Sequence, residues 1–204
     1  RKSEQKFEWK AFSAFKHWPI IALGLLGALY SLIINATNEI INPFLQTTFG
    51  ISVMVAGLFT TVWGIGVVIG GVTGGPLTDR IGQKKAVVVA LAISLVSVMI
   101  FAFTTTSVIA WLLVFIFGLA YGFYETVYFS ISMKRSDPRI AASMFSILMA
   151  IANLGTGIGL PFAGVLVDGV GYRWTFAIIA LLNLLAIPLL PSIFNKKASS
   201  TQSA

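Results

Sequence analysis

An acidic residue lies deep inside an apolar stretch of this chain, surrounded by tyrosines. Tyr121, Glu125 and Tyr128 share one face of a helix, and Tyr124 is adjacent. A carboxyl group in apolar surroundings can take up or release a proton when its surroundings change from wet to dry. Glu125 is therefore either a coupling site for a proton or cation, or a carboxyl tied to a nearby tyrosine or amide. The tyrosines either bind a solute or pack in the core.

A second polar stripe runs along an earlier apolar stretch. Ser31, Asn35, Asn38 and Asn42 follow one another at helical spacing, which places them on one helix face. Amide side chains are costly in lipid, so this face is expected to look into a water-filled cavity or a protein interface. Together with Asn153 from a later stretch, the two stripes predict a substrate cavity.

The elements that hold these residues are long and apolar. The chain of 204 residues is 57% hydrophobic and 10% charged, and its mean hydropathy is +0.90. Most of its apolar runs reach the roughly 20 residues that a helix needs to cross hydrocarbon, and the alternating pattern of barrel strands is absent. The sequence therefore predicts an all-α membrane protein with six transmembrane helices, at residues 20–41, 52–76, 86–104, 108–132, 142–167 and 173–194.

Composition and charge placement exclude several other classes of function. The chain has no cysteine and one histidine, so we expect no metal, no cofactor and no enzymatic activity. The net charge is +7, but of the fourteen Lys and Arg only Arg173 falls on one side of the six-helix path. This asymmetry predicts a multi-pass protein of a plasma or inner membrane with both ends in the cytoplasm. Its partners would be membrane lipids and not nucleic acid.

A short charged turn recurs along the chain. Residues 75–82 read GPLTDRIG, and residues 164–171 read GVLVDGVG, so both fit the pattern GxLxDxxG. The apolar runs recur at about the same offset, which predicts two three-helix repeats of opposite orientation. The predicted organisation is a basic amphipathic cytoplasmic segment at 1–18, repeats at 19–106 and 107–195, and a disordered tail at 196–204.

The first turn resembles the signature loop of the major facilitator superfamily, GxLxDRxGxxK. The chain has Gln83 where the family more often has Arg or Lys. The resemblance implies half of a secondary transporter, which moves a small solute by alternating access, with the other six-helix half and protons as partners. In the family this turn latches one conformation, a role that would fall to Gly75, Asp79, Arg80, Gly82, Lys84 and Lys85. Alternatively, the basic residues only fix the orientation in the membrane.

Other features bear on which half and which branch the chain represents. In that superfamily the fourth helix of the N-terminal half often carries an arginine. The absence of an arginine from the fourth run, and a basic lead-in that resembles the linker between the halves, therefore favour a C-terminal half. Residues 155–164, in contrast, resemble an antiporter motif of the N-terminal half. Residues 137–140 (DPRI) and 150–155 (AIANLG) resemble the peptide and acetyl-coenzyme A transporter branch. Small residues predict close helix packing and a hinge, at Gly57, Gly64, Gly71, Gly157, Gly159 and Pro161. The rival hypothesis is a non-transporting scaffold or receptor derived from a half-transporter.

Overall fold

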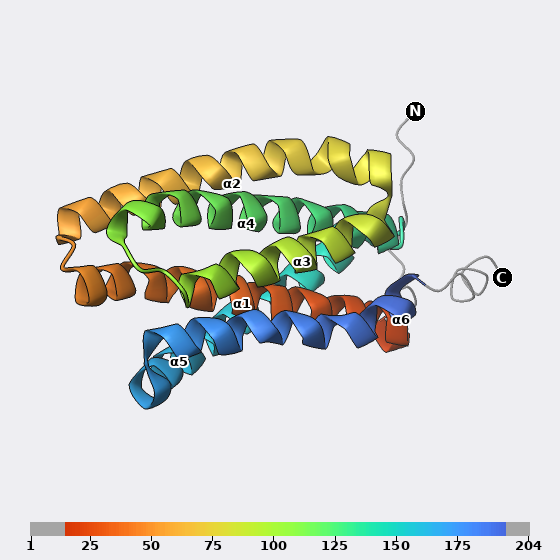
Figure 1. Cartoon of the computed structure of the whole chain (residues 1–204). Coiled ribbons are helices and arrows are strands. Elements are labelled where there is room, and N and C mark those ends of the chain that lie inside the picture. Colours follow the sequence, from red (N-terminus) through yellow and green to blue (C-terminus); the bar gives the residue numbers. More distant parts are fainter. Residues whose placement is uncertain (1–14, 195–204) are drawn as a thin grey trace.

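The computed structural model describes residues 15–194, which form a bundle of helices without strands (Figure 1). Five of these helices or helical spans are long and apolar enough to cross a membrane. The elements are α1 (Trp18–Phe49), α2 (Val53–Ile81), α3 (Gln83–Phe101), α4 (Ser107–Arg135), α5 (Ala141–Leu182), the 3-10 helix η2 (Asn183–Leu189) and α6 (Leu190–Phe194). The predicted tail at 196–204 and most of the predicted amphipathic segment at 1–18 lie outside the described residues.

The fifth and sixth predicted helices are not separate elements. They belong to one apolar span, Ala141–Phe194, so the described chain has five candidate spans where the sequence predicts six. α5 is interrupted at Gly171, whose φ of 78° and ψ of 166° lie outside the helical region. A positive φ is readily adopted only by glycine. The chain reverses its direction at this residue, and the second limb of α5 returns along α1 toward α6 (Figure 1).

The boundaries of the first four helices follow from local chemistry. Ser52 and Thr106 precede α2 and α4, and their hydroxyl oxygens accept hydrogen bonds from Val55 N and Ile109 N. Such caps satisfy backbone donors that the first helical turn leaves free. A further glycine with positive φ, Gly82, separates α2 from α3 without any intervening loop. The turn between α2 and α3 therefore lies at one end of the bundle and the break in α5 at the other (Figure 1).

Two helix pairs pack with their backbones in contact. α2 lies against α4, where an added Cβ on Gly70 would overlap the backbone of Leu119. The first limb of α5 lies against α1, where an added Cβ on Gly155 would overlap the carbonyl of Ala28. Small residues permit this close approach, which takes the place of a hydrophobic driving force inside a membrane. The glycines at these contacts are Gly66, Gly70, Gly118, Gly122, Gly155 and Gly159.

The predicted packing glycines lie mostly elsewhere. Gly159 is at the α1 contact, and Gly71 is in ordinary contact with Thr126. An added Cβ on Gly57, Gly64 or Gly157 would meet nothing within 4 Å, because these residues face outward. The helix also continues through Pro161, and the only non-helical residue inside α5 is Gly171. α2 and α5 thus each carry two different stripes of glycine. One stripe is packed against a neighbouring helix, and the other, which contains Gly57, Gly64 and Gly157, is open.

Arg173, just after the break in α5, is hydrogen-bonded to the connection between α3 and α4. Its Nη1 donates to the carbonyl oxygen of Ala102 at 3.0 Å, and its Nη2 donates to that of Thr104 at 2.8 Å. These carbonyls follow the C-terminal end of α3, where a positive charge is favourable. Arg173 therefore holds the α3–α4 connection and the second limb of α5 together at the end of the bundle opposite the charged turn.

Candidate functional site

A cavity of about 230 Å³ lies beside Glu125. Four of the predicted site residues meet there: Ser31, Glu125, Tyr128 and Asn153. They come from α1, α4 and α5, so residues that are far apart in the sequence form one wall. The remaining lining residues are Tyr30, Phe129, Met149 and Ala152, none of which the sequence pattern singles out.

The tyrosines form a cluster around Tyr30 of α1. The ring centroid of Tyr30 lies 4.5 Å from that of Tyr124, 6.0 Å from that of Tyr128 and 6.3 Å from that of Tyr121. Tyr124 is 1% exposed, and its hydroxyl has no hydrogen-bond partner within residues 15–194. Tyr124 therefore packs behind the cavity wall. Tyr121 does not line the cavity either, and its ring contacts Trp63 of α2, at 5.3 Å between ring centroids.

The amide stripe of α1 divides between two neighbours. Asn35 Nδ2 donates to the carbonyl oxygen of Ser31 at 2.9 Å and to Thr156 Oγ1 of α5 at 3.0 Å. Asn42 Nδ2 donates to Thr60 Oγ1 of α2 at 3.0 Å, and Asn38 lines a narrow space beside it. These amides tie α1 to the helices on either side, so only the Ser31 end of the stripe reaches the cavity beside Glu125.

Glu125 itself is half-buried and has no hydrogen bond or ion pair with the part of the chain that the structure describes. One helical turn separates it from Tyr121 on one side and from Phe129 on the other, because residues four apart are neighbours on a helix face. Across the cavity lie Met149 and Asn153 of α5. The carboxylate is therefore available to a proton or to a ligand.

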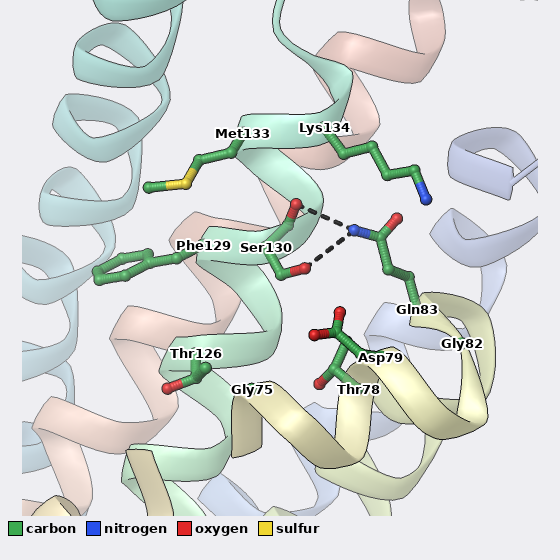
Figure 2. A pocket seen from close by; sticks show the side chains of 10 residues that line it. All are labelled: Gly75, Thr78, Asp79, Gly82, Gln83, Thr126, Phe129, Ser130, Met133 and Lys134. Carbon is green, nitrogen blue, oxygen red and sulfur yellow. Dashed lines mark hydrogen bonds between the residues drawn. The ribbon is translucent and has the colours of Figure 1, made fainter. Parts of the chain in front are cut away.

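The charged turn forms a second hollow, an open cleft of about 700 Å³ at the end of the bundle. Figure 2 shows Asp79 and Gln83 directed toward the last turns of α4, which contribute Ser130 and Lys134. Gly75 and Gly82 also line the cleft. The other predicted latch residues, Arg80, Lys84 and Lys85, are exposed and lie outside this lining.

The sequence pattern predicts that Asp79 lies near a helix N-terminus. The structure places Asp79 in the last turn of α2, four residues before α3 begins at Gln83. The C-terminal end of a helix disfavours an anion, whereas the N-terminal end of the next helix favours one. The Asp79 carboxylate makes no hydrogen bond or ion pair with residues 15–194, so it remains free to pair across the cleft.

Gln83, the departure from the family pattern, makes the contact that closes this turn onto α4. Its Nε2 donates both to the carbonyl oxygen and to Oγ of Ser130, each at 3.0 Å (Figure 2). A lysine or arginine could donate to the same carbonyl, but the short amide holds the beginning of α3 close to α4. No sequence signal for this contact exists, because the two residues are 47 positions apart.

Replacing Gln83 by leucine is expected to destabilise the full-length protein by about 1–2 kcal/mol, because two hydrogen bonds are lost. Ser130→Ala is the matched control, since it removes the hydroxyl acceptor but keeps the carbonyl, and its effect is expected to be smaller. The thermal unfolding midpoint of the purified proteins measures both effects. An unchanged midpoint for Gln83→Leu would show that the contact carries no stability.

The connection between α4 and α5 is held by a local ion pair. Asp137 Oδ1 accepts from Arg139 N at 2.9 Å, and Asp137 Oδ2 accepts from Arg139 Nη2 at 2.8 Å. The hydrogen bond from the Arg139 side chain lowers the pKa of the Asp137 carboxyl. This loop therefore keeps its shape at any pH at which Asp137 is ionised, and it fixes the entry of the chain into α5.

Comparison with known proteins gives consistent results. A sequence model of the Major Facilitator Superfamily matches residues 21–203. The gallate transporter of Pseudomonas putida is 28% identical over 174 residues, which is 85% of this chain and 38% of that protein. The chain thus spans well under half the length of this curated relative.

Two solved structures share the fold. A bacterial homolog of the human lysosomal transporter Spinster, inward-facing and unoccupied, superposes with a TM-score of 0.71 at 16% identity, over 93% of this chain and 50% of that one. The occupied inward-facing form superposes with a TM-score of 0.63 at 17% identity, over 86% of this chain and 49% of that one. At this identity the likeness concerns the fold alone. Because the family's own sequence pattern runs through every long helix described above, we conclude that this multi-pass membrane protein belongs to the Major Facilitator Superfamily.

Proposed function

We propose that this chain is one half of a secondary transporter that carries a small solute across a membrane by alternating access. The observation that supports this most is the cavity beside Glu125, where polar side chains from three apolar helices meet. Buried polar groups in a membrane protein mark a solute or ion pathway. The solved relative of similar fold extends over twice the length that this chain matches, which leaves room for a second half.

The proposed half contains six spans in two inverted repeats. Gly82 and Gly171 occupy the same position in the two GxLxDxxG turns, and their backbone angles are nearly equal, with φ and ψ of 81° and 148° against 78° and 166°. The packed glycines repeat as well. Gly155 follows Gly66 by 89 residues, the distance that also separates Gly171 from Gly82, and each of Gly66 and Gly155 contacts the first helix of the other repeat. These equivalences support counting the two limbs of α5 as separate spans.

The placement of charged residues supports the proposed orientation and type of half. The turn between α2 and α3, the end of α4 and the beginning of α1 lie at the same end of the bundle (Figure 1). The turn carries Arg80, Lys84 and Lys85, and the last turn of α4 carries Lys134, so by the positive-inside rule we place this end in the cytoplasm. We retain the C-terminal half as the proposal, because no described Lys or Arg lies in the middle of α4. The likeness of residues 137–140 and 150–155 to the peptide and acetyl-coenzyme A transporter branch remains part of this proposal.

The open glycine faces of α2 and α5 are the proposed seam with the other half. Gly57, Gly64 and Gly157 have free space around them, whereas the opposite faces of the same helices are packed. Gly157→Leu is therefore expected to lower the transport rate on the order of tenfold through overpacking of the seam. The unfolding midpoint is expected to change little. Ala92→Leu, on the exposed face of α3, is the matched control. Equal transport by both variants would contradict the seam.

The function is tested with the full-length protein in proteoliposomes under an imposed pH gradient. A defined mixture of aromatic amines, phenolic acids and short peptides is offered outside, and the vesicle contents are measured by mass spectrometry. We expect at least one solute to accumulate above the level in protein-free vesicles. Uptake of none of them, without any solute-dependent proton flux, would favour the non-transporting scaffold.

A further inference from the structure

We propose that the cavity beside Glu125 binds an organic ammonium cation. This inference rests on the transport function proposed above and names the class of its solute. It starts from the charge of the cavity wall: Glu125 is the one carboxyl group among the described residues that line the cavity, and no Lys or Arg from residues 15–194 lines the cavity with it. An anionic solute would meet a carboxylate without a compensating positive charge, which is costly at low dielectric constant.

Aromatic side chains lie near the carboxylate. Tyr121 and Phe129 lie one helical turn to either side of Glu125 on α4, and Tyr30 of α1 lines the cavity with it. The faces of such rings carry partial negative charge and attract ammonium groups, most strongly where water is excluded. A carboxylate between aromatic rings is thus complementary to a cation with apolar substituents, since the rings contact the substituents while the carboxylate neutralises the charge.

The rest of the cavity suits the apolar part of such a solute. Met149 and Ala152 of α5 offer a flexible thioether chain and a methyl group, and Asn153 and Ser31 are the only neutral polar groups besides the phenols. Met adapts its shape to different ligands. A volume of about 230 Å³ is below the roughly 300–1,000 Å³ of pockets for drug-sized ligands, which limits the solute to about one ring.

The unpaired state of Glu125 is the second observation that indicates a ligand. A half-buried carboxylate is normally hydrogen-bonded or paired. Within the described chain, Asn35 is bonded to Thr156 instead, and the Tyr128 hydroxyl is directed to the carbonyl oxygen of Leu148 at 3.5 Å. These two groups are committed elsewhere, and no residue of the described chain pairs with the carboxylate, which leaves it for an incoming cation.

The test uses purified full-length protein and three probes of similar size. Benzyltrimethylammonium has a charge that cannot be lost by deprotonation, neopentylbenzene is its uncharged isostere, and gallate is an aromatic anion. We expect saturable binding of radiolabelled benzyltrimethylammonium and at least about tenfold weaker competition by neopentylbenzene and by gallate.

Variants locate the binding site. Glu125→Gln is expected to weaken benzyltrimethylammonium binding at least about tenfold, and Glu125→Asp is expected to weaken it less because the charge is kept. Glu39→Gln, which removes an exposed acid of α1, is expected to change nothing. Preferred binding of gallate, or unchanged binding of benzyltrimethylammonium to Glu125→Gln, would overturn the proposal.

The same probes separate this inference from the proposed function. Uptake of gallate into proteoliposomes with no binding of benzyltrimethylammonium would rule out the cation site and support transport. Binding of benzyltrimethylammonium that depends on Glu125, without uptake of any solute, would support the site and rule out transport.

Discussion

Replacing Glu125 by glutamine is expected to abolish solute accumulation driven by a proton gradient, while exchange of solute at saturating concentration persists. The carboxyl is the only acid among the described residues that line the cavity, and the groups near it, Tyr30 and Tyr121, are phenols. The amide keeps nearly the same shape but cannot carry a proton. The helices can still alternate, so exchange needs no coupling group.

The expected size of this effect follows from the driving force. A pH difference of one unit is worth about 1.4 kcal/mol per proton, which supports about tenfold accumulation when one proton is coupled. For Glu125→Gln the ratio of internal to external solute is expected to be about one, whatever the gradient. Proteoliposome uptake and counterflow measure the two activities, and Glu39→Gln serves as the control. Full accumulation by Glu125→Gln would place the coupling group elsewhere.

The helices themselves could be predicted closely from the sequence. The first five apolar runs were expected to begin at 20, 52, 86, 108 and 142, and the structure begins the corresponding helices at 18, 53, 83, 107 and 141. Length and apolarity suffice because the bilayer allows few other structures. In the structure the fifth and sixth predicted helices form one continuous element. A single glycine, Gly171, reverses the chain at the place where the sequence predicts a loop of several residues.

The face that each helix turns inward could not be predicted. In α2, the stripe of Gly57 and Gly64 and the stripe of Gly66 and Gly70 are equally small and apolar. In a soluble protein the buried face is the apolar one, but in lipid both faces are apolar and the contrast disappears. Only the three-dimensional contacts show that Gly66 and Gly70 meet α4 while the other stripe stays open.

Part of the cavity lining was predictable where polarity interrupts apolar helices. Ser31, Glu125, Tyr128 and Asn153 stand out in such surroundings, and the structure places them around one cavity. Tyr30 did not stand out, although it is the centre of the tyrosine cluster, because one phenol beside a serine creates no periodic pattern. Its partners come from α4, about ninety residues later, and contacts of that range leave no trace in a single sequence.

The largest structural effect is expected from adding one methyl group at Gly155. Its Cβ would overlap the carbonyl oxygen of Ala28, which belongs to the backbone of α1 and cannot rotate away. α1 and α5 would therefore have to move apart along their whole contact. Overpacking of this kind costs on the order of 3 kcal/mol, and for Gly155→Ala we expect the unfolding midpoint of the full-length protein to fall by a few degrees.

A control substitution at another glycine of the same helix distinguishes the effect of overpacking from the effect of helix propensity. Gly169 of α5 has nothing within 4 Å of an added Cβ, so Gly169→Ala is expected to leave the midpoint unchanged or raise it slightly, since alanine favours a helix by up to about 1 kcal/mol over glycine. Gly122→Ala is expected to behave like Gly155→Ala, because its Cβ would overlap the carbonyl oxygen of Val67 in α2. If Gly155→Ala and Gly169→Ala have the same unfolding midpoint, backbone contact between the paired helices does not hold the bundle together. A fall that appears only at Gly155 and Gly122 means that the backbone contacts of α5 with α1 and of α4 with α2 hold the bundle together.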